Sequence, residues 1–391
     1  MNKILYVTTI SGFLPQFEMN DVRIMQQMGY EVHYASNFAN QMYTFDEKEL
    51  AADGIILHHI DIEKKPTRVF REFKAIRQIK RIIEEENISI VHCHNPMGGV
   101  CARIAAHHSS NRPYVIYTGH GLHFYKGAPA ANWLFYYPVE KLMARMSDVI
   151  VTINREDYDT VKNRFKLKKG GYAEQIPGVG LDMDRFDVRK ELAARVREEL
   201  HVPQGAFHIV TAAELNGNKN QQAVIEAVAG LPQKDIYYTI CGRGADEEKL
   251  RGLIGRLGLS DRVRLIGFRT DMERVLQSAD VFAFPSMREG LGMAAVEALA
   301  CGVPVICADN RGTREYVKDG VNGIVCSENS AGCMRAALAR LYGDREYLLR
   351  LAGQCRDSVR RFGTDNTMKI MKQVYTTADK AVGKAQKDGR C

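Results

Sequence analysis

The sequence predicts an α/β protein built from two doubly wound, Rossmann-like domains. Short apolar runs rich in β-branched residues alternate with amphipathic stretches, as expected for buried parallel strands joined by helices. This alternation occurs in two successive series, separated by a segment of proline and glycine at 177–180. Because ligands of open α/β sheets bind beyond the carboxyl ends of the strands, we expect the two domains to face each other across a cleft that holds the site.

The first series defines a domain over residues 1–176. Its strands are short apolar runs, whereas apolar residues in its helices recur at intervals of three and four. The expected strands are 4–7, 31–34, 88–93, 114–118 and 149–153. The expected helices are 19–27, 69–85 and 99–107.

The second series defines a domain over residues 177–363. The expected strands are 208–212, 237–241, 263–266, 281–284 and 303–307. The expected helices are 221–228, 247–257, 271–277 and 292–300. The remaining residues, 364–391, are expected to form a helix that crosses back to the first domain and ends in a polar tail.

The composition excludes several classes of protein. The 391 residues contain 54 Lys and Arg against 47 Asp and Glu, and the net charge of +7 is too small to indicate a nucleic-acid partner. The 9 cysteines form no Cys-x-x-Cys pair, which indicates reduced thiols rather than a metal cluster. The first residues do not resemble a secretory signal, and charge and proline interrupt the longest apolar stretch, 290–308. We therefore expect a cytoplasmic protein.

The strongest candidate site is the loop between the strand 281–284 and the helix that starts near Gly292. The N–H groups and the dipole of a helix start bind anions such as phosphate, and Gly290 and Gly292 let a ligand approach the backbone closely. Glu289 precedes this helix and Glu297 lies over one turn inside it, so both carboxylates can accept hydrogen bonds from polyol hydroxyls. The alternative is that Glu289 only balances the helix dipole and that Glu297 is a solvated helix residue.

The Glu-x7-Glu element of Glu289 and Glu297, with the residues 298–305 that follow, resembles the signature of retaining glycosyltransferase family 4. Supporting motifs, spread over about residues 3–375, are 242–244, 267–269, 311–315 and 319–323. The segments 117–127 and 132–140 resemble those of bacterial exopolysaccharide and capsule enzymes of this family. The resemblance implies a GT-B fold, a nucleotide-sugar donor in the interdomain cleft, no required metal, and retention of the anomeric configuration.

The resemblance also implies roles for individual residues. Glu297 would hold the ribose hydroxyls, Glu289 the hydroxyls of the donor sugar, and Lys219 the diphosphate. Many family members carry arginine where this chain has Glu214, so charge compensation must rest more on Lys219, the helix dipole and Arg243. The other donor-binding candidates lie in glycine-bearing loops: Gly242, Arg269, Gly290, Leu291, Gly292 and Met293.

Candidates in the first domain follow its expected strands. His120 lies between two glycines after the strand 114–118, and the resemblance implies that it contacts the donor near the reacting carbon. His92 and His94 end the strand 88–93 with a spacing that could indicate a metal site. Few other ligand residues are nearby, so we favour contact between His94 and the acceptor.

No metal or organic cofactor is expected. Ser11 and Gly12 form the acceptor-side loop after the first strand and do not make the GxGxxG pattern of nicotinamide-binding proteins. The Asp-x-Asp pair of Asp182 and Asp184 lies between the domains, and we interpret it as a turn or helix start. The nucleotide sugar is therefore expected as a substrate without a metal.

Two further segments bear on location and acceptor. Residues 64–81 contain eight basic residues and one acidic residue, Glu72, with apolar residues clustered on one side. A helix packed on the sheet with a solvated basic face is the favoured interpretation, and contact with an anionic membrane is the alternative. The aromatic segment 133–137 could belong to the core or form a wall for an acceptor's lipid or sugar.

The predicted function is that of a cytoplasmic glycosyltransferase, peripheral at the inner face of the cell membrane. It would move a hexose or N-acetylhexosamine from a UDP-sugar to a polyprenyl-diphosphate-linked saccharide during surface polysaccharide synthesis. The alternatives are transfer to a small soluble acceptor and a non-transferring GT-B enzyme such as a 2-epimerase. The sequence does not specify the sugar, the acceptor, the linkage or the oligomeric state.

Overall fold

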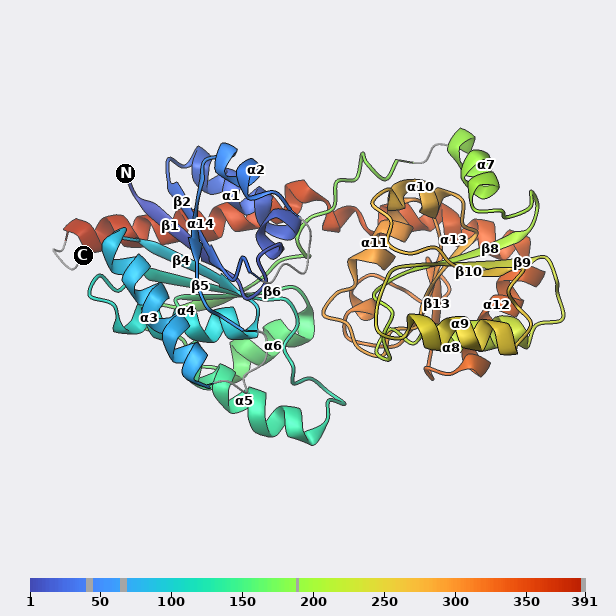
Figure 1. The fold of residues 1–391 in the computed structure, drawn as a ribbon, viewed down its shortest axis with the longest axis horizontal. Helices are drawn as coiled ribbons and strands as arrows, with labels where there is room; N and C mark the ends of the chain where they lie inside the picture. Colours follow the sequence, from blue (N-terminus) through green and yellow to red (C-terminus); the bar gives the residue numbers. More distant parts are fainter. Residues whose placement is uncertain (40–44, 64–68, 188–189, 388–391) are drawn as a thin grey trace. The chain divides into compact units, whose positions relative to one another are not determined.

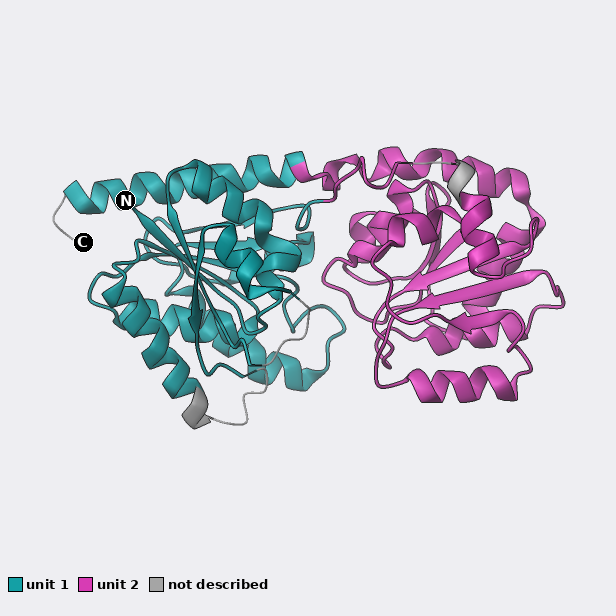
Figure 2. Ribbon diagram, turned by 45° about the horizontal axis from the view of Figure 1, so that its top comes forward, with its two compact units in different colours: residues 1–180, 365–391 teal, residues 181–364 magenta. Residues whose placement is uncertain are grey.

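A computed structural model describes residues 1–39, 45–63, 69–187 and 190–387. The chain divides into two compact units, unit 1 with residues 1–180 and 365–391 and unit 2 with residues 181–364 (Figure 2). Each unit contains a parallel sheet with helices on its faces (Figure 1). The prediction of two doubly wound α/β domains is therefore confirmed.

Unit 1 contains a seven-stranded parallel sheet in the order β3-β2-β1-β4-β5-β6-β7. Its strands are β1 (Lys3–Val7), β2 (Glu31–Ser36), β3 (Ile55–His59), β4 (Ile90–His94), β5 (Tyr114–Gly119), β6 (Val149–Thr152) and β7 (Tyr172–Gln175). The order reverses between β1 and β4, and such a switch point opens a crevice at the carboxyl ends of the strands.

The helices of unit 1 come from both ends of the chain. They are a π-helix (Leu14–Glu18), α1 (Met19–Gln27), α2 (Glu47–Ala52), α3 (Val69–Glu85), α4 (Pro96–His108), α5 (Ala130–Ala144), α6 (Arg155–Arg164) and the long α14 (Thr364–Lys387). Helix α14 returns to unit 1 and buries Tyr375 completely. The Tyr375 hydroxyl lies 2.8 Å from His92 Nδ1 and donates to Asp21 at 2.8 Å, so a polar network ties the C-terminal helix to β4 and α1.

Unit 2 contains a six-stranded parallel sheet in the order β10-β9-β8-β11-β12-β13, which reverses between β8 and β11. Its strands are β8 (Phe207–Ala212), β9 (Ile236–Cys241), β10 (Val263–Leu265), β11 (Val281–Phe284), β12 (Val305–Ala308) and β13 (Gly323–Cys326). Its helices are α7 (Lys190–Glu199), α8 (Gln221–Ala229), α9 (Glu247–Arg256), α10 (Met272–Gln277), α11 (Met293–Ala300), α12 (Ala331–Gly343) and α13 (Arg345–Ser358), with 3₁₀ turns at Thr313–Glu315 and Arg360–Phe362.

The sequence analysis missed three strands, β3, β7 and β13, all at sheet edges. An edge strand packs against one neighbour only, so it need not be a continuous apolar run. Every residue of β7 is partly exposed, and β3 is fully buried only at Ile55. Their composition therefore lacks the signal that identified the central strands.

The basic segment 64–81 falls partly outside the described residues, which resume at Val69. Its described part belongs to α3, whose Ala75, Ile79 and Ile83 are completely buried in the core of unit 1. On the outer side, Lys80 pairs with Glu84 and Arg81 with Glu85 one turn later. This is the packed helix with a solvated basic face. None of the helices that the structure describes combines the length and the apolar composition needed to cross a bilayer.

Candidate active site: one loop cluster in each unit

The loop that joins β11 to α11 in unit 2 and the loop after β12 each contain a glycine whose surroundings leave no room for a side chain. Gly292 has φ +91°, and a Cβ there would lie 2.7 Å from the Phe284 ring. A Cβ on Gly312 in the neighbouring loop would lie 2.7 Å from the carbonyl oxygen of Leu291, which also accepts a hydrogen bond from the Tyr316 hydroxyl at 2.9 Å. The start of α11 is thus held in place by close backbone packing, and its first N–H groups have no acceptor within the helix.

Lys219, from the loop after β8, and Glu289, from the loop after β11, form an ion pair. We refer to these two loops and the start of α11 as the loop cluster of unit 2. The Lys219 Nζ lies 2.6 Å from Glu289 Oε1, and the two side chains are 21% and 10% exposed. The loop after β8 and the loop after β11 meet at the switch point of the sheet, where the Asn218 carbonyl accepts from Met287 N at 2.8 Å and the Asn218 amide donates to the Arg288 carbonyl at 3.0 Å. Two residues that the sequence analysis assigned to separate parts of a donor are therefore direct neighbours.

Glu297 lies within α11 and is partly buried. The pKa of its carboxyl group is raised to about 7, mainly by burial, with Arg185 opposing the shift and Glu273 contributing to it. Its carboxylate makes no hydrogen bond to the part of the chain that the structure describes. A partly buried carboxylate without a protein donor is available to accept hydrogen bonds from a ligand, and its partial exposure is equally compatible with the solvated alternative.

The glycines around Arg243 have a structural reason of their own. A Cβ on Gly242 would lie 1.9 Å from the Ala213 carbonyl oxygen, and one on Gly244 would lie 2.2 Å from that of Leu215. They allow the segment after β9 to run directly beside the segment after β8. Arg243 itself is exposed there.

Arg269 and Glu214 are placed differently from the residues at the centre of the cluster. The Arg269 guanidinium binds Asp271 and Glu199, each at 2.8 Å, so two carboxylates already balance its charge. Glu214 is exposed to solvent. Among the described residues, neither Arg269 nor Glu214 contacts the Lys219–Glu289 pair.

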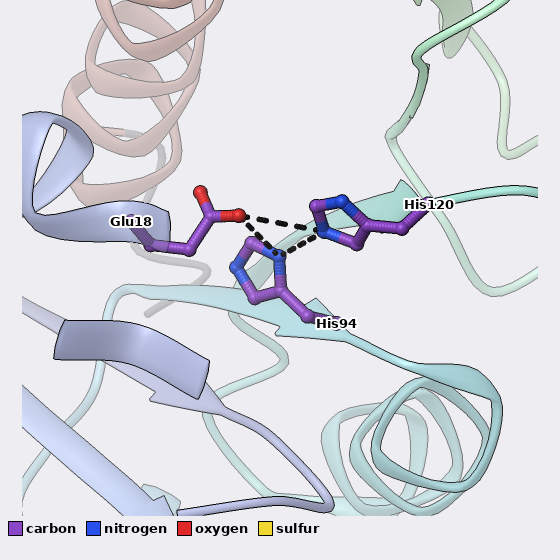
Figure 3. A group of neighbouring side chains, drawn as sticks. All are labelled: Glu18, His94 and His120. Atoms are coloured by element: carbon purple, nitrogen blue, oxygen red, sulfur yellow. Dashed lines mark hydrogen bonds and ion pairs between the residues drawn. The ribbon is translucent and has the colours of Figure 1, made fainter. Parts of the chain in front are cut away.

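The predicted histidines of unit 1 meet at the carboxyl ends of β4 and β5, together with a carboxyl group that the sequence analysis missed (Figure 3). His94 Nδ1 lies 3.2 Å from His120 Nε2. Glu18, from the π-helix after β1, places its Oε1 3.6 Å from His94 Nδ1 and 3.4 Å from His120 Nε2. His94 is completely buried, whereas the His120 side chain keeps 18% of its surface exposed.

Burial favours the neutral form of all three groups in this cluster. Burial lowers the pKa of His120 to about 4, and burial together with the neighbouring histidines holds the pKa of His94 well below its ordinary value. Burial and the nearby Asp21 raise the pKa of Glu18 well above the usual range of a carboxyl group. A neutral carboxyl group beside neutral imidazoles can pass and receive protons without creating a buried charge.

The same three atoms also fit the geometry of a small divalent cation. Separations of 3.2–3.6 Å between ligand atoms are what bonds of about 2.1 Å to one tetrahedral ion produce. A second group, His33, His58 and Glu86, has a similar ligand set. There, however, Lys3 Nζ lies 3.0 Å from Glu86 and already supplies a positive charge.

The other predicted residues of unit 1 have structural partners or are buried. His92 accepts and donates within the network of Tyr375 and Thr118, at 2.8 Å on each ring nitrogen. Ser11 and Gly12 are buried in the loop between β1 and the π-helix, and the Ser11 Oγ has no hydrogen-bond partner among the described residues. At the start of unit 2, the Asp182–Asp184 pair forms a turn, since Asp182 Oδ1 accepts from the backbone N of Asp184 at 3.1 Å.

Comparison with known proteins finds glycosyltransferase family models that match a large part of each unit. The family model "Glycosyl transferase 4-like" matches residues 3–154, and the model "Glycosyl transferases group 1" matches residues 194–357. EpsD of Bacillus subtilis (strain 168), named as a glycosyltransferase, is 36% identical over 96% of each chain. The chain belongs to glycosyltransferase family 4.

More distant relatives share the same fold. Anabaena Alr3699/HepE, solved in complex with UDP-glucose, superimposes on this family-4 glycosyltransferase with a TM-score of 0.78 at 18% identity, over 96% of this chain and 100% of the other. An Escherichia coli relative is 24% identical over 74% of this chain and 76% of its own length. It is named UDP-Gal:alpha-D-GlcNAc-diphosphoundecaprenol alpha-1,3-galactosyltransferase.

Within this family-4 glycosyltransferase, sequence patterns identified the glycine-bearing loops but missed residues that line the clusters or hold their loops in place. Glu18 carried only a weak signal, a single acid between Phe17 and Met19 in a segment with no motif. Asn310 was likewise missed, although its amide donates to the Ser286 carbonyl at 3.0 Å and holds the loop before α11.

Proposed function

We propose that this glycosyltransferase moves a hexose or N-acetylhexosamine from a UDP-sugar to a polyprenyl-diphosphate-linked saccharide, with retention of configuration and without a metal. The observation that carries the proposal is the Lys219–Glu289 pair beside the start of α11. A diphosphate needs cations and N–H donors, whereas a sugar needs carboxylates that accept from its hydroxyls. The pair and the helix start supply both within one loop cluster.

The donor and acceptor classes are supported by the relatives. HepE was solved with UDP-glucose, and the E. coli relative is named for a UDP-sugar donor and a diphosphoundecaprenol-linked acceptor. The partly buried carboxyl group of Glu297, without a protein donor, suits the two hydroxyls of a ribose. We propose the inner face of the cell membrane as the place of action, because a polyprenyl-linked acceptor is anchored in a bilayer.

The proposed chemistry is a front-face substitution. The bond between the anomeric carbon and the β-phosphate oxygen breaks while the acceptor oxygen bonds to the same face of that carbon. The acceptor's proton passes to the departing phosphate oxygen, and UDP leaves. Lys219 and the N–H groups at the start of α11 stabilise the charge on the leaving group, and Glu289 holds the sugar hydroxyls.

His120 would assist in its neutral form. Its low pKa keeps the imidazole uncharged at neutral pH, so it can exchange hydrogen bonds with a sugar hydroxyl close to the reacting carbon. Glu18 and His94 lie against the ring and hold it in place. In this account they are positioning residues.

The test starts with a thermal-shift panel of nucleotide sugars, followed by transfer assays on lipid-linked acceptors with the best donor. We expect a UDP-sugar to stabilise the protein and to be hydrolysed slowly in the absence of acceptor. Glu289→Gln should abolish transfer, whereas Glu248→Gln, an exposed acid on α9, should not. An inverted linkage, detected by NMR of the product, would refute the front-face mechanism. A change in the donor sugar without transfer would favour an epimerase.

A further inference from the structure

Helix α5 of unit 1 exposes large apolar side chains to solvent. Leu134, Phe135, Val139 and Leu142 are exposed to 69%, 66%, 44% and 52%. Their spacing of one, four and three residues places them on one face of the helix, with Pro138 between them. We refer to these four side chains as the α5 apolar stripe. A contiguous apolar surface of this kind on a folded domain marks a binding site.

The stripe does not arise from a poorly packed helix. On the opposite side of α5, Trp133 and Tyr137 pack against Phe124, with ring centroids 5.6 and 5.2 Å from it. Glu140 is buried there and pairs with Arg103 at 2.8 Å. The inner face of α5 is thus firmly attached to the core of unit 1. A helix that is apolar all round is normally covered on every side, and here one side is open.

The charges beside the stripe indicate what covers it. Lys141 lies between Val139 and Leu142 of the stripe, Arg145 caps the C-terminus of α5, and both are exposed. The one acid of α5, Glu140, is consumed by the buried pair with Arg103. On α3, Lys74, Lys80 and Arg81 are each paired with an acidic side chain and Arg77 is exposed. The cations of α5 differ in lying directly beside exposed apolar side chains, where they can contact anionic headgroups.

We propose that the α5 apolar stripe, with Lys141 and Arg145, docks this protein on an anionic lipid bilayer. Apolar side chains would enter the boundary between headgroups and acyl chains, while the two cations contact the phosphates. The proposal extends the proposed function, since the loop 120–129 that begins with His120 leads directly into α5. A lipid-linked acceptor in the same bilayer would then reach the candidate site in unit 1.

The test measures co-sedimentation of the full chain with phosphatidylcholine vesicles, with and without phosphatidylglycerol. We expect wild type to bind the anionic vesicles and Phe135→Ser/Leu142→Ser to bind about 10-fold more weakly. Leu349→Ser is the matched control, because Leu349 is exposed to 68% on α13 in unit 2. Lys141→Gln/Arg145→Gln should lose the preference for anionic vesicles, whereas Arg81→Gln on α3 should keep it.

Two results would overturn the proposal. One is equal binding of wild type and Phe135→Ser/Leu142→Ser to anionic vesicles. The other is a wild type that ignores vesicles and forms a dimer that this double substitution dissolves, measured by light scattering, which would assign the stripe to a second copy. Hydrolysis of a UDP-sugar in solution separates this proposal from the enzymatic one. The stripe variants should retain wild-type hydrolysis even where vesicle binding is lost.

Discussion

The two loop clusters occupy equivalent places, the switch points of two parallel sheets, yet they differ in charge. In unit 2 a lysine and a glutamate form an ion pair beside a helix start. In unit 1 a carboxyl group and two imidazoles lie together, and burial shifts the pKa of each towards its neutral form. One scaffold can thus serve a charged ligand and a neutral hydroxyl, depending on which side chains follow the strands.

The charged cluster gives the largest expected effect. Lys219→Ala should lower kcat/KM for transfer about 100- to 1,000-fold, because the leaving diphosphate loses its nearest side-chain cation. Lys249→Ala, an exposed lysine on α9, is the control, and circular dichroism checks the fold. Activity within a factor of two of wild type would show that Lys219 has no role in the mechanism. The assignment of a charged ligand to the cluster of unit 2 would then lose its support.

The neutral cluster is tested through His120. His120→Ala should lower kcat about 100-fold, whereas His108→Ala on the exposed end of α4 should not. Because the pKa of His120 is about 4, its protonation should not affect the wild-type rate between pH 5 and 8. If kcat of wild type changed with pH near the ordinary histidine pKa, and this change disappeared in His120→Ala, the low pKa of His120 would be contradicted.

The network behind the neutral cluster should show in stability. Tyr375→Phe removes a buried hydroxyl that serves both His92 and Asp21, and should cost about 1–3 kcal/mol in free energy of unfolding. The matched control is Tyr342→Phe, whose exposed hydroxyl binds Asp235 in unit 2 and should matter little. Urea denaturation of both variants makes the comparison, and equal effects would contradict it.

Glu297 gives a smaller, pH-dependent effect. Its pKa is raised to about 7 in the folded protein, so ionisation destabilises the fold progressively as the pH rises from its unfolded pKa, near 4.5, to about 7. Glu297→Gln should therefore be more stable than wild type above pH 7, by on the order of 1–3 kcal/mol, and equal to it below pH 4.

The same group should make UDP binding depend on pH. Ribose hydroxyls donate to the ionised carboxylate, so wild-type affinity should rise with pH up to about 7 more steeply than that of Glu297→Gln, which reflects the ionisation of the UDP phosphate alone. Calorimetric titration at several pH values measures both. Parallel profiles for the two proteins would place the ribose elsewhere.

The smallest expected effect is that of metal removal. Treatment with a chelator should leave transfer unchanged, and Glu18→Gln, which keeps the residue neutral, should lower the rate less than about 5-fold. Loss of activity on chelation, restored by Zn²⁺ in wild type and not in Glu18→Gln, would instead assign Glu18, His94 and His120 to a metal site.

Local sequence determined the central strands and the loops after them. Apolar β-branched runs identify buried parallel strands wherever both faces are covered, and residues such as Gly292 stand where a close backbone approach requires them. The edge strands β3, β7 and β13 lacked that signal because one side of each has no strand partner.

Only the tertiary structure decided which side chains meet and what charge they carry. The ion pair of Lys219 and Glu289 joins residues 70 positions apart, and Glu18 reaches the histidines of β4 and β5 because the switch point of the sheet brings three loops together. The aromatic segment 133–137 was ambiguous in sequence because periodicity does not show which side of an all-apolar helix is covered. In the structure Trp133 and Tyr137 pack inward and Leu134 and Phe135 face solvent, since the sheet provides only one side to pack against.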